Sequence, residues 1–364
     1  MPASKRIVLS TELNEQAMTQ VFWSGCYSAD LEGRGVGIGV LRRRDDGTLH
    51  YLGTALHASS PSALVQHPLL GDVLYATLEG SERLEAFRRT GELTLESLGS
   101  QPAPGPFPCH GSVARDGKTL FTASYGSGAL GLSPLSEDGS LQPLGRVLHF
   151  KGNGPRPAQG GAHGHTAMVL DQSTLINIDL GTDEVRLFEI VQGDLRSLHT
   201  LRLPRGSGPR DLLVHPSGFL YVLTELSNEV FVLNLLRERA QLSIVGSTPL
   251  VDGSALDASK AAVISVSGDG NYVYAGVRGA NVIATLSVRE GGRRLERIAA
   301  VSTRGDWPRH HIVDGQFLYV CNQLSDTVAS FTLNARTGVP EPLGEPEHVP
   351  SPTFLLRATP ARDE

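Results

Sequence analysis

The stretch PRDLLVHPSGFLYVLTELSNEVFVLNL at residues 209–235 contains three short apolar segments separated by turns. A Pro-led apolar segment runs into the turn HPSG, an apolar and aromatic segment ends in a polar pair, and a β-branched segment follows a short loop. Short apolar runs bounded by Gly, Pro, Asn and Ser are typical of β-strands and their turns. The stretch therefore predicts three consecutive antiparallel strands.

The same order of segments recurs along the chain, clearly at 61–87 and 308–333 and more weakly at 108–135, 162–190 and 261–288. The copies begin at intervals of 44 to 54 residues, at Pro61, Pro108, Ala162, Pro209, Ala261, Pro308 and Pro352. Periods in the forties with four strands each are typical of propeller blades. The repeat predicts an all-β, seven-bladed β-propeller with four-stranded blades and almost no helix.

The seventh copy, SPTFLLRATP at 351–360, stops after its first strand, and the missing three strands are found at 21–28, 35–44 and 49–56. Pairing the two chain ends across one blade leaves no free sheet edge at the seam. We expect residues 1–364 to form one domain, with 1–20 as an N-terminal extension packed on the outside. Two tandem β-sandwiches are the main alternative, but the repeat runs through the middle of the chain without a linker.

The composition excludes several classes of protein. The 41 Gly and 22 Pro suit many turns, and 40% apolar residues with a net charge of only -6 exclude a disordered chain. No Lys/Arg run is longer than Arg42 to Arg44, so nucleic acid is not an expected partner. The chain has no long apolar run and no apolar stretch near its start, which predicts a cytoplasmic protein with no membrane partner. Three widely spaced cysteines predict neither a disulfide framework nor a zinc site.

The repeat register selects candidate site residues. In a propeller the first strand of each blade lines the axial channel, so residues where first strands begin and second strands end gather at one mouth. The first strands supply His110, His163, His165, Arg210, Arg309, His310 and His311. The second strands supply Glu79, Tyr125, Glu225, Arg278, Asn322 and Gln323. Imidazoles, guanidinium groups and carboxylates around one mouth suit binding of a small anionic substrate and proton transfer.

Each candidate also has a structural interpretation. Arg210 and Arg309 each follow a Pro at the start of a blade, where they would pair with a neighbouring carboxylate and serve only the fold. His163 and His165 lie two apart, so on a strand they point to the same face, and one of them would be a buried hydrogen-bonding partner. The sequence leaves these alternatives open.

Two repeat units, at 206–235 and 305–338, resemble the lactonase family with a seven-bladed propeller, which includes non-classical 6-phosphogluconolactonases and fungal carboxymuconate cyclases. The likeness covers nearly the whole chain. It implies a hydrolase acting on a sugar-derived or acidic lactone without a cofactor. The alternatives are a carboxymuconate-type lactonizing cycloisomerase and a non-catalytic propeller that binds a ligand or protein. The oligomeric state stays open.

The resemblance also implies roles for individual residues. The catalytic residues would be His163 or His165, Arg210, Glu225 and Arg278. The other mouth residues, which the repeat register selects, are the predicted substrate-binding residues: His110, Glu79, Tyr125, Arg309, Asn322 and Gln323. Calcium-dependent lactonase propellers bind the ion through side-chain oxygen ligands of the kind that Glu79, Glu225 and Asn322 offer. The nearby Arg residues would repel a divalent cation, so we expect no bound metal.

This chain departs from the family pattern at two positions. The Pro that precedes the histidine motif is Ala162, and the residue after Arg210 is Asp211 where the family usually has His. A carboxylate next to the anion-binding Arg210 would disfavour a doubly charged phosphate, so the lactonase class is a firmer expectation than the substrate 6-phosphogluconolactone.

Overall fold

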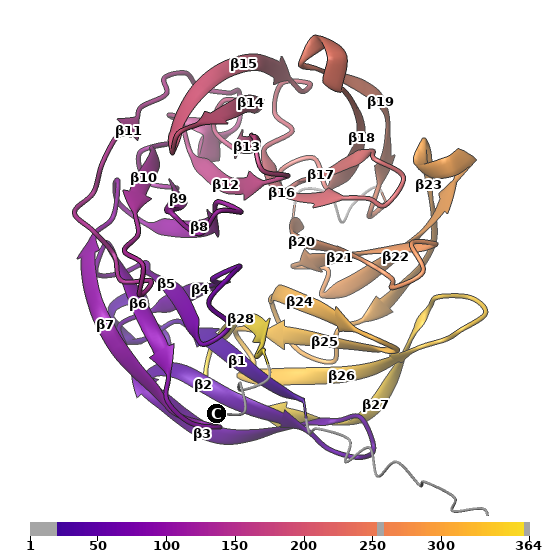
Figure 1. The fold of residues 1–364 in the computed structure, drawn as a ribbon. Helices are drawn as coiled ribbons and strands as arrows, with labels where there is room; N and C mark the ends of the chain where they lie inside the picture. Colours follow the sequence, from indigo (N-terminus) through magenta and orange to yellow (C-terminus); the bar gives the residue numbers. More distant parts are fainter. Residues whose placement is uncertain (1–19, 253–257, 360–364) are drawn as a thin grey trace, which may run out of the picture.

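The structure, a computed structural model, describes residues 20–252 and 258–359. Seven four-stranded sheets form a ring around a central axis, as Figure 1 shows. This confirms the predicted seven-bladed propeller. Residues 1–19 of the expected N-terminal extension lie outside the described residues.

Six blades are continuous in sequence, and in each the first strand is innermost. Blade 1 contains β4 (Pro61–Gln66), β5 (Val73–Leu78), β6 (Arg83–Arg89) and β7 (Leu95–Pro102), and blade 2 contains β8 (Pro108–Val113), β9 (Thr119–Ser124), β10 (Leu130–Pro134) and β11 (Val147–Leu148). Blade 3 contains β12 (Gly164–Val169), β13 (Thr174–Asp179), β14 (Glu184–Val191) and β15 (Asp194–Arg202), and blade 4 contains β16 (Pro209–Val214), β17 (Leu220–Thr224), β18 (Glu229–Leu236) and β19 (Gln241–Pro249). Blade 5 contains β20 (Lys260–Val266), β21 (Tyr272–Arg278), β22 (Val282–Arg289) and β23 (Arg294–Ser302), and blade 6 contains β24 (Pro308–Asp314), β25 (Phe317–Asn322), β26 (Thr327–Leu333) and β27 (Pro340–His348).

Blade 7 joins the two ends of the chain. Its innermost strand is β28 (Pro352–Arg357), followed outward by β1 (Val21–Cys26), β2 (Gly37–Arg43) and β3 (Leu49–His57). The antiparallel register places Trp23 opposite Leu356 and Gly25 opposite Phe354. The predicted closure by one C-terminal and three N-terminal strands is therefore confirmed.

Helix in the described ranges is limited to single 3-10 turns, η1 (Ala29–Leu31), η2 (Pro157–Gln159), η3 (Arg237–Arg239) and η5 (Glu290–Gly292). None of the helices in this part of the chain is long and apolar enough to cross a membrane.

The hydrophobic core is divided among the interfaces between blades. Seven buried clusters occur in the described residues, and each joins two neighbouring blades. Second strands such as β5, VLYATL, are buried at every position because both faces of a blade pack against neighbours. Buried tyrosines bridge the interfaces; the hydroxyl of Tyr75 donates to the carbonyl of Gly139 at 2.8 Å, and that of Tyr221 to Gly292 at 2.9 Å. This packing between blades fixes the backbone at the channel mouth, and the side chains there project from that fixed backbone.

Candidate functional site

The innermost strand of every blade carries a β-bulge near its start. In blade 4, Pro209 lies opposite Thr224 and Asp211 opposite Leu223, so Arg210 is the extra residue. Bulges re-aim side chains and are common beside active sites. The seven extra residues, here called the bulge ring, are Ser62, Cys109, His165, Arg210, Ala262, Arg309 and Thr353. All seven line one cavity of about 500 Å³, together with other residues of the innermost strands.

A second ring, here called the exit ring, lies where the second strands end. Its members are Tyr27, Glu79, Tyr125, Leu180, Glu225, Arg278 and Gln323. Because first and second strands are antiparallel, the exit ring lies at the same mouth as the bulge ring. Five of its residues were predicted from the repeat register, whereas Leu180 and Tyr27 were not, and Tyr27 is the functional residue that was missed. The signal was present, since VFWSGC at 21–26 is the second strand of blade 7 and Tyr27 follows it directly.

Arg210 connects the two rings. Its Nη1 donates to Nε2 of His165 at 2.5 Å and to Oε2 of Glu225 at 2.9 Å, and its Nε donates to the carbonyl of Ala262 at 2.8 Å. The side chains of Arg210 and Glu225 are 8% and 9% exposed. Three fixed partners therefore orient one buried guanidinium group.

Arg278 approaches the same carboxylate from blade 5. Its Nη2 lies 2.7 Å from Oε2 of Glu225, and its Nε donates to the carbonyl of Lys260 at 3.1 Å. The guanidinium also lies over the ring of Trp307, 5.3 Å from the ring centroid. Two guanidinium groups thus share one carboxylate, which leaves this cluster with a net positive charge.

The charges of this cluster set the protonation states. Burial raises the pKa of Glu225, but the positive charges of Arg278 and Arg210 outweigh it and lower the pKa to about 2. Glu225 is therefore ionised at neutral pH and orients the two arginines. Burial, and next the charge of Arg210, holds the pKa of His165 well below 6.5, so its imidazole is neutral.

The tautomers of the two candidate histidines follow from their partners. A guanidinium group can only donate, so Nε2 of His165 accepts from Arg210 and the ring proton is on Nδ1, which is buried and has no partner in the described part of the chain. Nδ1 of His163 lies 2.8 Å from the carbonyl oxygen of Tyr125 and therefore donates to it. The lone pair of His163 is consequently on Nε2.

The two histidines also occupy different places. His165 lines the axial cavity, whereas His163 is not among its lining residues. The ring of His163 stacks on Tyr125 with centroids 4.6 Å apart, and its backbone N–H donates to Asp179 at 2.8 Å. Asp179 is fully buried and paired with Arg186. His163 is thus fixed against Tyr125, and neither residue is among those that line the axial cavity.

A second polar cluster brings together residues of blades 6, 7 and 1. The hydroxyl of Tyr27 lies 3.0 Å from both carboxylate oxygens of Glu79 and donates to them. Arg309 donates from Nη2 to the Tyr27 hydroxyl, lies 3.6 Å from Glu79, and places its guanidinium over the Tyr27 ring at 4.4 Å. Glu79 and Arg309 were predicted site residues, and the structure places them together.

Deeper in the channel, predicted polar residues link neighbouring innermost strands. Nδ1 of His310 accepts the N–H of Leu355 at 3.2 Å, and Nδ1 of His110 accepts the N–H of Ala167 at 3.4 Å. Burial lowers the pKa of His310 to about 3 and that of His110 to about 4. Both line the cavity, but the acceptor atom of each imidazole is already engaged by the fold.

Asp211 has the same bridging role. Its Oδ1 accepts the N–H of Leu212 at 2.8 Å and its Oδ2 the N–H of Ile264 at 2.9 Å, and it makes no hydrogen bond to Arg210 among the described residues. The charge of Arg210 nevertheless still acts on this carboxylate, so the expectation that Asp211 disfavours a doubly charged phosphate stays a prediction.

Two predicted residues of blade 6 differ in placement. Asn322 is fully buried, and its Nδ2 donates to the carbonyl of Thr303 at 2.9 Å, so it holds a loop and does not line the cavity. Gln323, the next residue, belongs to the exit ring but is likewise not among the cavity-lining residues, and its Oε1 is buried without a hydrogen-bond partner among the described residues. In the described ranges, no group of three or more His, Cys, Asp or Glu side chains is placed to hold a metal ion.

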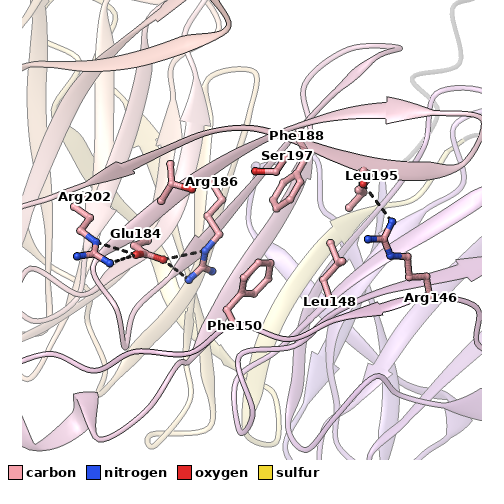
Figure 2. Close-up of a pocket in the computed structure, with 10 residues that line it drawn as sticks. Arg146, Leu148, Phe150, Glu184, Arg186, Phe188, Leu195, Ser197 and Arg202 are labelled. Atoms are coloured by element: carbon pink, nitrogen blue, oxygen red, sulfur yellow. Dashed lines mark hydrogen bonds and ion pairs between the residues drawn. The ribbon is translucent and has the colours of Figure 1, made fainter.

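A second cavity, of about 540 Å³, lies away from the axis between blades 2 and 3 (Figure 2). Phe150 and Phe188 form part of its wall, and Glu184 there pairs with both Arg186 and Arg202. The guanidinium of Arg186 also lies over Phe150 at 3.9 Å. The buried charges of this cavity are thus paired with one another. The axial cavity instead combines side chains from the β-bulges with the imidazole N–H of His165, which has no partner within residues 20–252 and 258–359.

Comparisons with known proteins agree with this geometry. Residues 21–357 match the family described as "Lactonase, 7-bladed beta-propeller". A 6-phosphogluconolactonase of Bacillus subtilis is 33% identical over 256 residues, which cover 69% of this chain and 72% of that protein. The periplasmic gluconolactonase PpgL of Pseudomonas aeruginosa superposes with a TM-score of 0.86 at 25% identity, covering 93% of this chain and 99% of that one. A Lactobacillus plantarum protein superposes with a TM-score of 0.87 at 26% identity over 93% and 99% of the two chains. The chain therefore belongs to the seven-bladed β-propeller lactonase family and is a lactone hydrolase.

Proposed function

We propose that this enzyme hydrolyses a gluconolactone-type sugar lactone at the mouth of the axial channel, with 6-phosphogluconolactone as the leading candidate substrate. The observation that carries the proposal is the buried pair Arg210 and Arg278, which share Glu225 beside His165. The names of the Bacillus subtilis and Pseudomonas aeruginosa relatives refer to enzymes for this class of lactone, which supports the substrate class.

Arg210 and Arg278 would bind the acidic group of the substrate and stabilise the developing oxyanion. Nη2 of Arg210 and Nη1 of Arg278 make no hydrogen bond to any residue in the described ranges. Guanidinium donors match phosphate and carboxylate oxygens and stabilise negative charge strongly in a buried site. The ionised Glu225 lies between the two arginines and would keep both guanidinium groups oriented.

His165 is the proposed proton acceptor, since it lines the cavity and touches Arg210. A water molecule attacks the lactone carbonyl carbon while Nε2 of His165 takes one proton from it. The bond between that carbon and the ring oxygen then breaks, and the imidazolium returns the proton to the leaving oxygen. The product is the open hydroxy acid.

Nε2 of His165 must be released before it can accept that proton. The carbonyl oxygen of a bound lactone, and more strongly an acidic group on the substrate, would draw the guanidinium of Arg210 toward itself and partly neutralise its charge. Because that charge is one of the causes that lower the pKa of His165, the bound anion would also raise this pKa. Substrate binding would thus activate the base.

The test is a comparison of 6-phosphogluconolactone, glucono-δ-lactone and a carboxymuconate at mildly acidic pH, where spontaneous lactone opening is slow. We expect hydrolysis of the first two above the spontaneous rate, with a higher kcat/KM for the phosphorylated lactone. Rates equal to the spontaneous ones on both lactones would contradict the proposal. Lactone formation from carboxymuconate instead would establish the cycloisomerase alternative.

A further inference from the structure

The mouth of the channel is electrostatically asymmetric. On the side of blades 3 to 5, two guanidinium groups face one carboxylate, at Arg210, Arg278 and Glu225. On the side of blades 6, 7 and 1, one guanidinium faces one carboxylate, at Arg309 and Glu79. The first side suits an anion, whereas the second is neutral overall and offers donors and acceptors together.

The neutral side is rigid. Tyr27 holds Glu79 by its hydroxyl and Arg309 by both hydroxyl and ring face. The side chains of Glu79 and Arg309 are 10% and 16% exposed. Fixed, largely buried groups bind a ligand with little loss of side-chain entropy.

The neutral side also has unused hydrogen-bonding capacity. Arg309 lines the axial cavity, and its Nε and Nη1 make no hydrogen bond within the described part of the chain. These free donors of a cavity-lining guanidinium are available to the acceptor oxygens of a ligand.

A hydroxyl group both donates and accepts a hydrogen bond. A carboxylate and a guanidinium fixed side by side satisfy both functions at once, and a row of hydroxyl groups can use several such positions. We infer that Tyr27, Glu79 and Arg309 form the subsite for the hydroxyl groups of the substrate and determine specificity for polyhydroxylated lactones. Glu79 accepts from the hydroxyl groups, Arg309 donates to them, and Tyr27 positions both side chains. This inference rests on the proposed function, because it gives a substrate-binding role to the other side of the same channel mouth.

The test is calorimetric binding of two carboxylates of equal chain length, gluconate and hexanoate, which differ in their hydroxyl groups. We expect wild type to bind gluconate more tightly. Tyr27→Phe should weaken gluconate binding about tenfold, the effect of one to two hydrogen bonds, and leave hexanoate binding unchanged. Glu79→Gln, as a second variant, should act in the same direction. Glu82→Gln, at an exposed position of the same hairpin, is the matched control and should change neither affinity.

Equal wild-type affinity for the two carboxylates would overturn the inference, as would a loss of both affinities in Tyr27→Phe, which indicates a general structural role. Binding is measured without turnover, so the proposed function is judged separately. A Tyr27-dependent preference for gluconate in a protein that hydrolyses no sugar lactone would uphold the subsite and refute the proposed function.

Discussion

Nη1 of Arg210 lies 2.5 Å from Nε2 of His165, in a contact where only the guanidinium can donate. The lone pair of the cavity-lining imidazole is therefore occupied by this hydrogen bond. The same guanidinium is tied to Glu225, and through Glu225 to Arg278. An anion that engages Arg210 would thus act on the base, the orienting carboxylate and the second arginine together.

The pH dependence of kcat/KM should reflect the lowered pKa of His165. In the free enzyme, burial and the charge of Arg210 hold this pKa well below 6.5, so the base stays neutral as the pH falls past 6.5. We expect kcat/KM for glucono-δ-lactone to stay constant from pH 7.5 to below 6 and to decrease only at more acidic pH. An acid limb centred at 6.5 would contradict this assignment.

The two histidines should differ in their effect on turnover. His165→Gln removes the proposed proton acceptor, and loss of a general base typically costs about 10² to 10⁴-fold in rate. His163→Gln retains a polar side chain next to Tyr125 and should lower kcat less than tenfold. Steady-state kinetics of both variants with one lactone, alongside circular dichroism to establish folding, checks the difference. The reverse order of effects would transfer the role to His163.

Arg210→Lys should lower kcat/KM by roughly 10 to 100-fold, the cost of one or two charge-assisted hydrogen bonds. A lysine keeps the positive charge but cannot contact Ala262, His165 and Glu225 at the same time, as the planar guanidinium does. Arg304→Lys, at a surface ion pair with Glu345, is a control that should leave kinetics unchanged. Wild-type kinetics in Arg210→Lys would show that the site needs only positive potential.

Acid should destabilise the fold through the buried channel histidines. Burial lowers the pKa values of His310 and His311 to about 3 and that of His110 to about 4, from 6.5. Below pH 6.5 the unfolded chain binds protons that the folded protein does not, so stability decreases from pH 6.5 toward pH 4. His310→Asn retains an acceptor near Leu355 and should reduce the fall in Tm between pH 7 and 4.5 by on the order of 2 °C.

Asp211 should change the pH dependence of stability in the direction opposite to the buried histidines, and it therefore serves as a control. Burial raises its pKa from 3.8 to about 6, so the folded protein binds this proton more tightly and gains stability as the pH falls through that range. Asp211→Asn removes the gain and should make the acid loss of Tm steeper. A parallel shift of Tm at all pH values in both variants would show that these groups do not govern the acid response.

Truncation after Pro350 should abolish cooperative folding. It removes β28, whose partner β1 is buried at every position, and exposes the core between blades 6, 7 and 1. Truncation after Thr359 keeps β28 and the contacts of Thr359 with Gly71 and Arg89, so it should melt like the full chain. Thermal unfolding followed by circular dichroism compares the two. Equal midpoints would contradict the role of β28 in closing the ring.

The blade count and the strand boundaries could be predicted because their signals are local. Each blade has its own Pro or Ala start, apolar second strand and turn, and the spacing from Pro61 to Pro352 counts the blades without reference to contacts. The register also placed Arg210, Glu225 and Arg278 at one mouth, because antiparallel pairing of consecutive strands fixes which residues lie at the same end.

What the sequence could not decide depended on side-chain direction and on contacts between distant segments. Asn322 and Gln323 are adjacent, yet Asn322 is the last residue of β25 and holds a loop, whereas Gln323 lies just beyond the strand and belongs to the exit ring. Tyr27 reaches Arg309 only because blade 7 joins the two ends of the chain. The different tautomers of His163 and His165 depend on whether a carbonyl or a guanidinium approaches the ring, and those partners come from neighbouring blades. The repeating local patterns in the sequence therefore determined the seven-bladed ring. The chemistry at the channel mouth was decided only by the tertiary structure, because packing between blades brings side chains from different blades within hydrogen-bonding distance of one another.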